Sequence, residues 1–315
     1  MKVLHVTNAF PYDDYSSYGI FVKEQINSLS ELGLENEIIF INSRKFGFSQ
    51  YFSQINEVRK AINIFRPDIV HCHHEFSIIA CLPAFFFKRI PIVLSLLGDI
   101  SKRSLMNRVF FGCVKFLPTS IIYKSSISQV GSNCYYLPNG VDTDFFQPVS
   151  KLNARSALKL DSNRKYVLFV SASLGNPIKR YDKFLAIISE LRKTDNEVEG
   201  LVMSGVERKL VPLYFNAADL LLLTSDHEGS PNAIKEAMSC NIPIVSTDVG
   251  NVRRLFQTSH GLFVHSLDDF DGLVSSCRKA LSLKNSNGRD AIFGHGLDMK
   301  SVATGLADIY RKTQL

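Results

Sequence analysis

Residues 228–247 decide the fold of this chain, and they read Glu228-Gly229-Ser230-Pro231-Asn232-Ala233-Ile234-Lys235-Glu236-Ala237-Met238 and, after Ser239 and Cys240, Asn241-Ile242-Pro243-Ile244-Val245-Ser246-Thr247. Ser230 is a good N-cap and Pro231 a good first helical residue, because proline lacks an N–H that would be unpaired there anyway. Glu228 is therefore expected in a loop just before a helix. Glu236 is expected inside that helix, roughly 8 Å along its axis at about 1.5 Å per residue.

The predicted helix start between the two glutamates suits an anionic ligand. Its free N–H groups and the helix dipole both favour a group such as phosphate. The stretch therefore predicts a ligand with hydroxyls at both ends and phosphates between them. The alternative is a solvated pair of glutamates near a helix end, which the dipole also favours.

The same stretch resembles the Glu-x7-Glu signature of the retaining glycosyltransferases of family 4, which have the GT-B fold. The matching positions are Glu228, Glu236, Ala237, Met238, Pro243, Ile244, Val245, Thr247 and Gly250. The resemblance implies an α/β protein of two Rossmann-like domains, whose parallel sheets face each other across a cleft. It also implies an enzyme of the hexosyltransferase type that transfers a sugar with retention of anomeric configuration.

Length and composition agree with a two-domain soluble enzyme. The chain has 315 residues, of which 45% are hydrophobic, which suits roughly two domains of about 150 residues. It has no apolar run of about 18 residues, and residues 1–6 lack the apolar block of a signal peptide, so a cytoplasmic location is expected. Six scattered cysteines without a C-x-x-C pair predict reduced thiols.

The charge of the chain limits the classes of partner that it is expected to bind. A net charge of +6 and a pI near 8.9 are compatible with anionic sugar nucleotides or a phospholipid surface. Nucleic acid is not expected, because the charge is spread and lacks clustered arginines interleaved with aromatic residues.

Predicted strands alternate with predicted helices along the chain. Strands are expected at 2–7, 37–41, 67–71, 92–96, 166–171, 201–203, 220–223 and 244–246, with helices at 20–32, 51–65 and 182–191. This alternation predicts parallel sheets with helices on both faces and a ligand site at the carboxyl ends of the strands. The turn formers of residues 138–142 lead us to expect domains 1–145 and 146–315. This division is compatible with a last helix that packs against the first domain.

That boundary segment contains a possible metal motif. It resembles the interdomain turn P-N-G-V-D of family 4, but Asp142-Thr143-Asp144 also matches the Asp-x-Asp pattern that holds a divalent metal in glycosyltransferases of the GT-A fold. Aspartates in a turn after Asn-Gly more often cap local backbone donors. We therefore predict no metal and no cofactor.

Donor contacts are expected after the strand at 166–171. The resemblance puts Lys179 on the donor diphosphate, while the arginine usual in the family is replaced by Ser173 or Leu174. Arg180 is either its substitute or a solvated residue at a helix start. In the first half, Gly19 is expected near the diphosphate, because a glycine lets backbone approach a ligand closely; the alternative is a plain loop glycine.

The acceptor side departs from the family pattern. Leu97 occupies the position of the family's histidine in Leu96-Leu97-Gly98-Asp99, so that histidine's role has no direct counterpart, while Asp99 is expected to bind a hydroxyl. The run 71–75 (His-Cys-His-His-Glu) suggests zinc. However, successive strand residues face opposite ways and no second ligand group is spaced to complete a tetrahedron. We expect core or cleft packing, with His73 or His74 on the acceptor side.

Only a short segment separates Gly205 from Asp219, where many family 4 chains insert a further strand. In this respect the chain resembles the branch of family 4 that includes teichuronic acid biosynthesis glycosyltransferases. This branch implies a saccharide acceptor, lipid-linked, at the inner face of the plasma membrane. Aromatic residues alternate with cations in the first half, as in an interfacial surface. These segments are Phe85-Phe86-Phe87-Lys88-Arg89, Lys102-Arg103, Arg108-Val109-Phe110-Phe111 and Lys115-Phe116. An ordinary core with charged rims accounts for them equally well.

The resemblance implies a metal-independent mechanism driven by donor contacts. Glu236 would accept hydrogen bonds from the ribose, while Glu228 and the backbone of Gly229, Ser230 and Asn232 would hold the sugar. Lys179, with Arg180 and the helix dipole, would stabilise the departing diphosphate, so Lys179 and Glu228 are the expected catalytic residues. Two alternatives stay open: a nonhydrolysing sugar-nucleotide epimerase and a catalytically silent subunit that binds nucleotide sugar. A Rossmann dehydrogenase fits less well, since no G-x-G-x-x-G follows the first strand.

Overall fold

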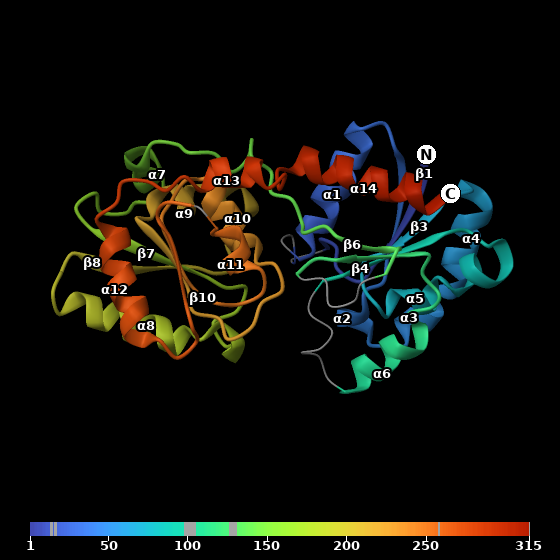
Figure 1. Ribbon diagram of the computed structural model, residues 1–315, viewed down its shortest axis with the longest axis horizontal. Helices are drawn as coiled ribbons and strands as arrows, with labels where there is room; N and C mark the ends of the chain where they lie inside the picture. Colours follow the sequence, from blue (N-terminus) through green and yellow to red (C-terminus); the bar gives the residue numbers. More distant parts are fainter. Residues whose placement is uncertain (13–14, 16–17, 98–104, 126–130, 258, 315) are drawn as a thin grey trace. The chain divides into compact units, whose positions relative to one another are not determined.

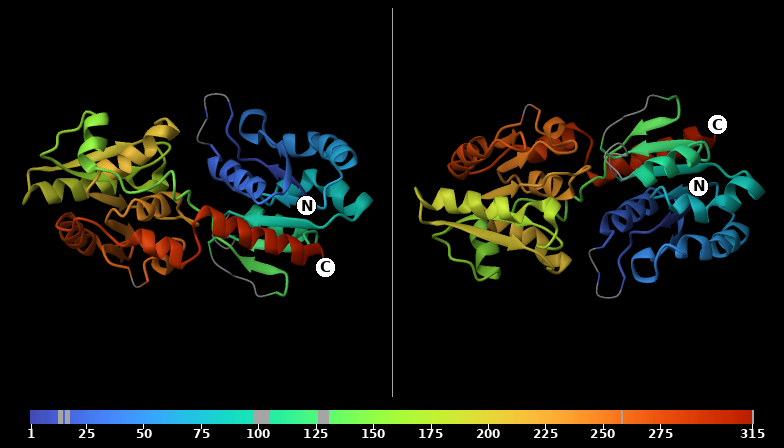
Figure 2. Two further views of the ribbon diagram at one scale, coloured as in Figure 1. Left: turned by 90° about the horizontal axis from the view of Figure 1, so that it is seen from above. Right: turned by 90° about the horizontal axis from the view of Figure 1, so that it is seen from below.

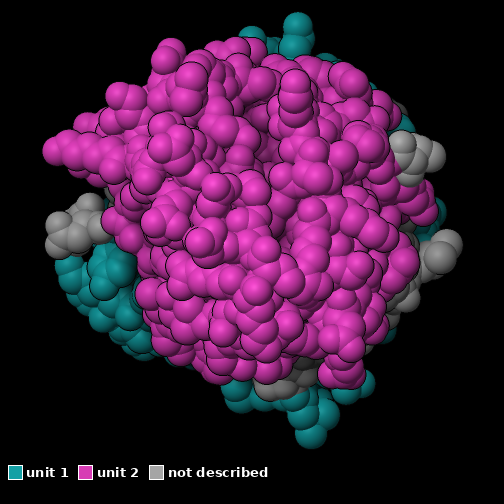
Figure 3. Space-filling model, turned by 90° about the vertical axis from the view of Figure 1, so that its left-hand side faces the viewer, with its two compact units in different colours: residues 1–140, 299–315 teal, residues 141–298 magenta. Residues whose placement is uncertain are grey.

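The computed structural model of the chain describes residues 1–12, 15, 18–97, 105–125, 131–257 and 259–314. It divides into two compact units, which Figure 3 colours separately. Unit 1 comprises residues Met1–Gly140 and Met299–Leu315, and unit 2 comprises Val141–Asp298. No described helix is long and apolar enough to cross a membrane.

The sheet of unit 1 has six parallel strands in the order β2-β1-β3-β4-β5-β6. Their bounds are β1 Lys2–Thr7, β2 Glu35–Phe40, β3 Ile69–Cys72, β4 Ile92–Leu96, β5 Ser120–Tyr123 and β6 Cys134–Tyr136. Strands β1, β3, β4 and β5 are almost wholly buried, which explains why most of their residues are apolar. The order reverses between β1 and β3, which makes that pair a topological switch point.

Helices cover both faces of this sheet (Figure 1). Their bounds are α1 Ile20–Glu31, α2 Ser43–Phe46, α3 Gln50–Ser53, α4 Ile55–Phe65, α5 Ser77–Ala80, the π-helix η1 Ala84–Lys88, α6 Leu105–Val114 and α14 Met299–Gln314. One face packs against α1 and α14 through a core that includes Leu29 and Leu306. The other face packs against α3 to α6 through a core that includes Val58, Ile78 and Phe111.

Unit 2 has a five-stranded parallel sheet in the order β11-β10-β9-β7-β8. Its strands are β7 Lys165–Val170, β8 Val198–Met203, β9 Leu220–Leu223, β10 Ile244–Thr247 and β11 Leu262–His265. The first two strands pair with each other, and the third returns to the other side of β7. The switch point therefore lies between β7 and β9, and a ligand site is expected at their carboxyl ends.

Helices also cover both faces of the second sheet (Figure 2). Their bounds are α7 Lys151–Ala157, the 3₁₀-helix η3 Pro177–Lys179, α8 Tyr181–Arg192, the 3₁₀-helix η4 Arg208–Leu210, α9 Val211–Ala217, α10 Asn232–Ser239, α11 Val252–Leu255, α12 Phe270–Leu281 and α13 Gly288–Gly294. One face packs on α8 and α12, with Phe184 and Leu273 fully buried. The fold class predicted from the sequence, α/β with two parallel sheets, is confirmed.

Strands β5, β6 and β11 were not among the predicted strands. They are three or four residues long and lack the run of four aliphatic residues that marks the equally short β9. The helix expected over 51–65 is two helices, α3 and α4, which meet at Gln54.

The C-terminal helix α14 is part of the core of unit 1. Leu306 and Tyr310 are fully buried against the sheet, although they lie more than 150 residues beyond the rest of the unit. In Figure 1, α14 runs beside α1. The unit is thus completed by a segment that follows unit 2 in the sequence.

We expect Leu306→Ala to lower the free energy of unfolding of unit 1 by about 2–5 kcal/mol, because it leaves a cavity in the core. The measurement is urea denaturation followed by circular dichroism and by hydrogen exchange of unit 1 amides. Lys300→Ala, at an exposed position of the same helix, is the matched control. Equal stability of the two variants would contradict the placement of α14.

Candidate functional site

The switch point of unit 2 brings two predicted site residues together. Lys179 closes the 3₁₀-helix that follows β7, and Glu228 lies in the loop that follows β9. The Lys179 Nζ donates to Glu228 Oε1 at 2.6 Å, although the residues are 49 positions apart. The geometry therefore places a cation and a carboxylate where an open parallel sheet binds its ligands.

The loops that carry this ion pair are held by further hydrogen bonds. Ser225 donates its hydroxyl to Glu228 Oε1 at 2.9 Å. The Thr224 hydroxyl donates to the carbonyl groups of Lys179 and Arg180. Both charged side chains are mostly buried, with exposed fractions of 25% for Lys179 and 16% for Glu228. A partly buried pair is screened less by salt than a surface pair, so its charges remain effective toward a ligand.

The helix after Glu228 begins one residue later than predicted. Helix α10 starts at Asn232 with Pro231 as its N-cap, and no side chain caps it. Ser230 is not the cap, because its hydroxyl accepts hydrogen bonds from Lys235 Nζ and Asn251 Nδ2. Lys235 itself is fully buried. Ser230 thus joins the loop to α10 and to the segment after β10.

Gly250 is required by the close approach of two loops in this site. Its φ of +57° lies in the left-handed region, and an added Cβ would lie 2.0 Å from the carbonyl oxygen of Gly229. The Asn251 N–H also donates to that oxygen at 3.1 Å. The glycine at this position of the sequence motif therefore serves the backbone of the loop that carries Glu228.

A buried side-chain acceptor and two backbone N–H groups lie at the start of α10. The Oδ1 of Asn232 is buried, and among the described residues it has no hydrogen-bond partner. Within the same described part of the chain, the N–H groups of Gly229 and Ser230 donate to no backbone carbonyl. Buried polar groups are normally satisfied, so Asn232 Oδ1 is suited to a ligand donor.

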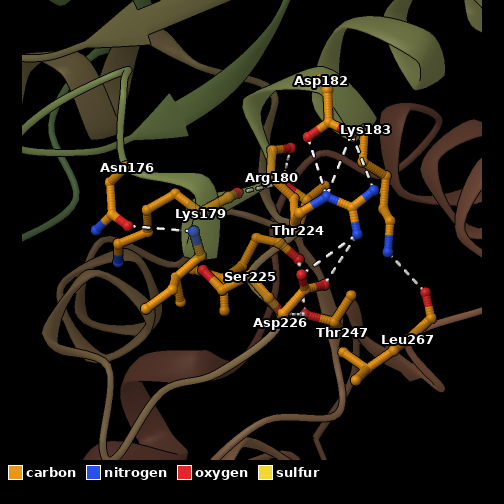
Figure 4. Close-up of polar contacts among 12 residues, drawn as sticks. Asn176, Lys179, Arg180, Asp182, Lys183, Thr224, Ser225, Asp226, Thr247 and Leu267 are labelled. Atoms are coloured by element: carbon orange, nitrogen blue, oxygen red, sulfur yellow. Dashed lines mark hydrogen bonds and ion pairs between the residues drawn. The ribbon is translucent and has the colours of Figure 1, made fainter.

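Arg180 pairs with one carboxylate close to it in the sequence and with another from the loop that follows β9 (Figure 4). Its guanidinium donates to Asp182 at 2.9 Å and to Asp226 at 3.1 Å. These hydrogen bonds, with Asp182 first, raise the pKa of Arg180 further above its ordinary value. The residue also adopts φ 52°, in the left-handed region. Both roles expected for Arg180, as a donor contact and as a residue at the helix start, remain predictions.

Glu236 has a partner that sequence reasoning missed. Arg208, the first residue of η4, donates from Nη1 to Glu236 Oε1 at 3.0 Å. The two residues are 28 positions apart and belong to no common motif. The short connection between β8 and α9 could have pointed to Arg208, because it leaves few positions from which a cation can reach α10.

In unit 1, Gly19 lies at the start of α1 with φ +66°. An added Cβ would lie 2.1 Å from the carbonyl carbon of Ala9, so the close approach of these two backbone segments alone requires glycine. A contact of Gly19 with diphosphate remains a prediction. Asp99 lies outside the described residues, and Leu97 is partly buried at the end of β4.

His73 and His74 differ in environment. His73 is 1% exposed, whereas the His74 ring is 18% exposed, accepts the Phe76 N–H at 3.3 Å and lies 3.5 Å from Glu75 Oε2. Of the two, His74 is the one with access to solvent. An acceptor contact by either residue remains a prediction.

His73 belongs to a buried polar cluster on the α14 face of the sheet. The cluster combines His5 of β1, His71 of β3 and His73, each at most 1% exposed. Its ring contacts are His5 Nδ1 to His73 Nε2 at 3.0 Å, His5 Nε2 to Asn36 Oδ1 at 2.9 Å, His71 Nδ1 to Tyr310 Oη at 2.6 Å and His71 Nε2 to Ser95 Oγ at 2.8 Å. These contacts thus link strands β1, β2, β3 and β4 to α14.

This arrangement corrects the expectation that no further ligand group lies near His71 and His73. One ring nitrogen from each of His5, His71 and His73 lies within 4.8 Å of the others. Both nitrogens of His5 and both of His71 are already hydrogen-bonded, so zinc would have to replace those contacts. We therefore interpret the cluster as a hydrogen-bonded network.

Burial controls the charge of this cluster. It lowers the pKa of His5 to about 4 and those of His71 and His73 well below the ordinary value of 6.5. Lys124, which follows β5, is fully buried, and burial lowers its pKa to about 7. Within the described part of the chain, its Nζ has no hydrogen-bond partner. The neighbouring Lys124 charge also lowers the pKa values of His71 and His73.

The aspartates of the interdomain turn have a local role. Asp142 Oδ1 accepts the N–H groups of Asp144 and Phe145 at 3.0 and 2.9 Å. This is the capping expected of an aspartate after Asn-Gly. The absence of a required metal remains a prediction.

We expect Lys124→Met to stabilise unit 1 most at low pH. The unfolded chain protonates this lysine at its ordinary pKa of 10.5, whereas the folded chain does so only near pH 7. The cost of burying the charge is therefore complete below pH 7 and vanishes above pH 10.5. At about 1.4 kcal/mol per pKa unit, the gain at pH 6.5 is a few kcal/mol.

Urea denaturation of the wild type and Lys124→Met between pH 6.5 and 10.5 measures this difference. Lys23→Met, at an exposed position of α1, is the control and should show no such pH dependence. A difference between wild type and Lys124→Met that stays constant over this range would contradict the interpretation.

Two family models match the chain, one in each half. Residues 28–145 match Glycosyltransferase Family 4, and residues 189–282 match Glycosyl transferases group 1. The first match lies almost entirely in unit 1. The second lies in unit 2 and includes the two glutamates and Arg208.

Relatives and solved structures agree with these matches. A protein of Bacillus subtilis described as the teichuronic acid biosynthesis glycosyltransferase TuaC is 23% identical to this chain. The match covers 84% of this chain and 85% of TuaC. Sucrose-phosphate synthase from Thermosynechococcus elongatus is 13% identical with a TM-score of 0.79, with 99% of each chain covered. HepE from Anabaena, in complex with UDP-glucose, is 16% identical with a TM-score of 0.68, with 99% of this chain and 100% of HepE covered. The two halves of the chain therefore match the models of glycosyltransferase family 4 and of glycosyl transferases group 1, and the chain has the GT-B fold and is an enzyme of the hexosyltransferase type.

Proposed function

We propose that this glycosyltransferase transfers a sugar from a nucleoside diphosphate sugar to a lipid-linked saccharide, with retention of configuration and without a metal, in surface polysaccharide synthesis. One observation carries the donor assignment. Lys179 and Glu228 form a 2.6 Å pair at the switch point of the unit 2 sheet, beside the start of α10. The structure of HepE with UDP-glucose and the similarity to TuaC support this class of substrate and process.

In the proposed reaction, Lys179 stabilises the negative charge that develops on the leaving diphosphate. Its Nζ is already held in place by Glu228, so little reorganisation is needed when the charge appears. Glu228 and the groups of Gly229, Ser230 and Asn232 hold the sugar, and Glu236 holds the ribose. The acceptor hydroxyl attacks the face from which the diphosphate departs.

A surface of unit 1 supports the membrane part of this proposal. Exposed apolar residues lie on α2, α3, η1 and α6 and just beyond them: Phe46, Phe48, Phe52, Phe85, Phe86, Leu105, Met106, Val109 and Phe116. The rings of Phe48, Phe76 and Phe110 connect α3 to α6, with centroids 5.1 and 4.8 Å apart. Figure 1 shows α2, α3 and α6 near one another.

The charge of this surface suits an anionic membrane. The sequence has no Asp or Glu at 42–56, 76–98 or 100–141, while Lys88, Arg108 and Lys115 lie among the apolar residues. Each Lys or Arg near an anionic leaflet contributes about 1 kcal/mol of attraction. We therefore propose that this face of unit 1 contacts the cytoplasmic leaflet.

Incubation with a panel of UDP-, GDP- and ADP-sugars tests the donor assignment. We expect one donor to stabilise the wild type against thermal unfolding, by roughly 2.7 kcal/mol at about 100 times its dissociation constant. Lys179→Ala and Glu228→Ala should each lower the rate of transfer about 10²–10³-fold, since each removes a preorganised contact to the reacting group. EDTA should leave the rate unchanged.

Lys165→Ala is the matched control, because Lys165 forms a similar ion pair of 2.7 Å with Asp195 in the same unit. It should transfer sugar normally. Near-normal transfer by both site variants would refute the assignment. NMR of the donor without acceptor distinguishes the epimerase alternative, because only an epimerase would then invert a sugar carbon.

Sedimentation with lipid vesicles tests the membrane contact. We expect the protein to pellet with vesicles that contain phosphatidylglycerol and to stay in solution with phosphatidylcholine alone, because cations and aromatic residues act together. Leu105→Glu with Met106→Glu should abolish pelleting. Leu152→Glu, at an exposed apolar position of unit 2, should have no effect, and equal pelleting with both lipids would remove the membrane claim.

A further inference from the structure

Arg208 is placed to control the carboxylate of Glu236. It begins η4 directly after the short loop that follows β8, and its Nη1 donates to Glu236 Oε1 at 3.0 Å. Their side chains have exposed fractions of 21% and 13%. A charge-assisted hydrogen bond that is mostly removed from water is stronger and better oriented than one on the surface.

Two aromatic rings confine the same guanidinium from another side. The Arg208 Cζ lies 4.7 Å from the ring centroid of Phe146 and 5.2 Å from that of Phe145. Phe146 is fully buried, and the N–H of Phe145 is held by Asp142. The planar guanidinium is suited to stacking as well as to hydrogen bonding, which a lysine ammonium is not.

The carboxylate retains capacity for a ligand. Only Oε1 of Glu236 has a recorded hydrogen bond among the described residues, and Arg208 is its donor. An ionised carboxylate accepts through both oxygens, so Oε2 remains for a ligand hydroxyl. Arg208 thus fixes the orientation of the carboxylate and compensates its charge before a ligand arrives.

We propose that Arg208 is a positioning residue of the donor site, which acts through Glu236 to bind the ribose of the nucleoside diphosphate. This inference rests on the proposed function. It gives the arginine a role in ligand affinity, whereas a purely structural ion pair would affect only stability. Two measurements separate these roles: the nucleotide affinity of Arg208 variants, and the dependence of the Arg208 effect on Glu236.

Calorimetric titration with UDP, GDP and ADP tests the proposal on wild type, Arg208→Gln, Arg208→Lys, Glu236→Gln and the double variant Arg208→Gln/Glu236→Gln. We expect Arg208→Gln to weaken the nucleotide that binds wild type by about tenfold, or about 1.4 kcal/mol. The same variant should raise the donor KM similarly and leave kcat at saturating donor nearly unchanged, since the contact is to the ribose. Arg208→Lys should restore part of the affinity.

The double variant should bind no more weakly than Glu236→Gln, because a residue that acts only through Glu236 has nothing left to position. Lys209→Gln is the matched control, since Lys209 is the adjacent exposed cation and pairs with Glu207. Nucleotide affinity of Arg208→Gln equal to that of Lys209→Gln would overturn the proposal. So would full additivity of the two single losses.

Three further results are also decisive. If Arg208→Gln does not fold, normal nucleotide affinity of a folded Arg208→Lys would overturn the proposal. If the wild type binds none of the three nucleotides and transfers no sugar, the proposed function is wrong and the inference falls with it. If the wild type binds and transfers but Arg208 variants behave normally, only the inference is wrong.

Discussion

The ion pair between Lys179 and Glu228 depends on the geometry of a parallel sheet and in turn organises the loops of unit 2. Parallel strands end at one edge, so the segments that follow β7 and β9 meet although they are distant in sequence. The pair, with the hydroxyls of Thr224 and Ser225, joins these two segments. Gly250 then allows the segment after β10 to contact the same loop. Three strand ends therefore share one local network.

A second network, in unit 1, also joins neighbouring parallel strands, but through neutral hydrogen-bonded groups in place of an ion pair. Polar side chains from β1, β3 and β4 meet on the α14 face, where burial keeps the histidines neutral. In unit 2 the paired charges are partly exposed, whereas in unit 1 the groups exchange hydrogen bonds without a countercharge. The first arrangement suits an ionic ligand. The second connects the sheet to the C-terminal helix.

The architecture and the local motifs could be predicted from the sequence. Contacts between residues far apart in the chain could not. Apolar runs such as residues 220–223 are continuous because those strands are buried on both faces, which makes them visible without a structure. Glu228 and Glu236 were identified through a spaced motif in one segment, and Lys179 through the resemblance of the loop that follows the strand at 166–171. Arg208 and His5 were missed because each meets its partner only after the strands are in register. Ser230 was misassigned as a helix cap because its hydroxyl binds side chains from two other segments.

The division of unit 1 in the sequence has a consequence for biosynthesis. Residues 141–298 form a continuous unit that can complete its own core as soon as it leaves the ribosome. Unit 1, although translated first, lacks α14 until the last residues emerge, and Tyr310 and Leu306 are missing from its core until then. Unit 1 therefore cannot complete its core before all of unit 2 has been synthesised, although most of unit 1 is made first. A chain truncated after residue 298 would keep every residue of unit 2 but would lose part of the core of unit 1.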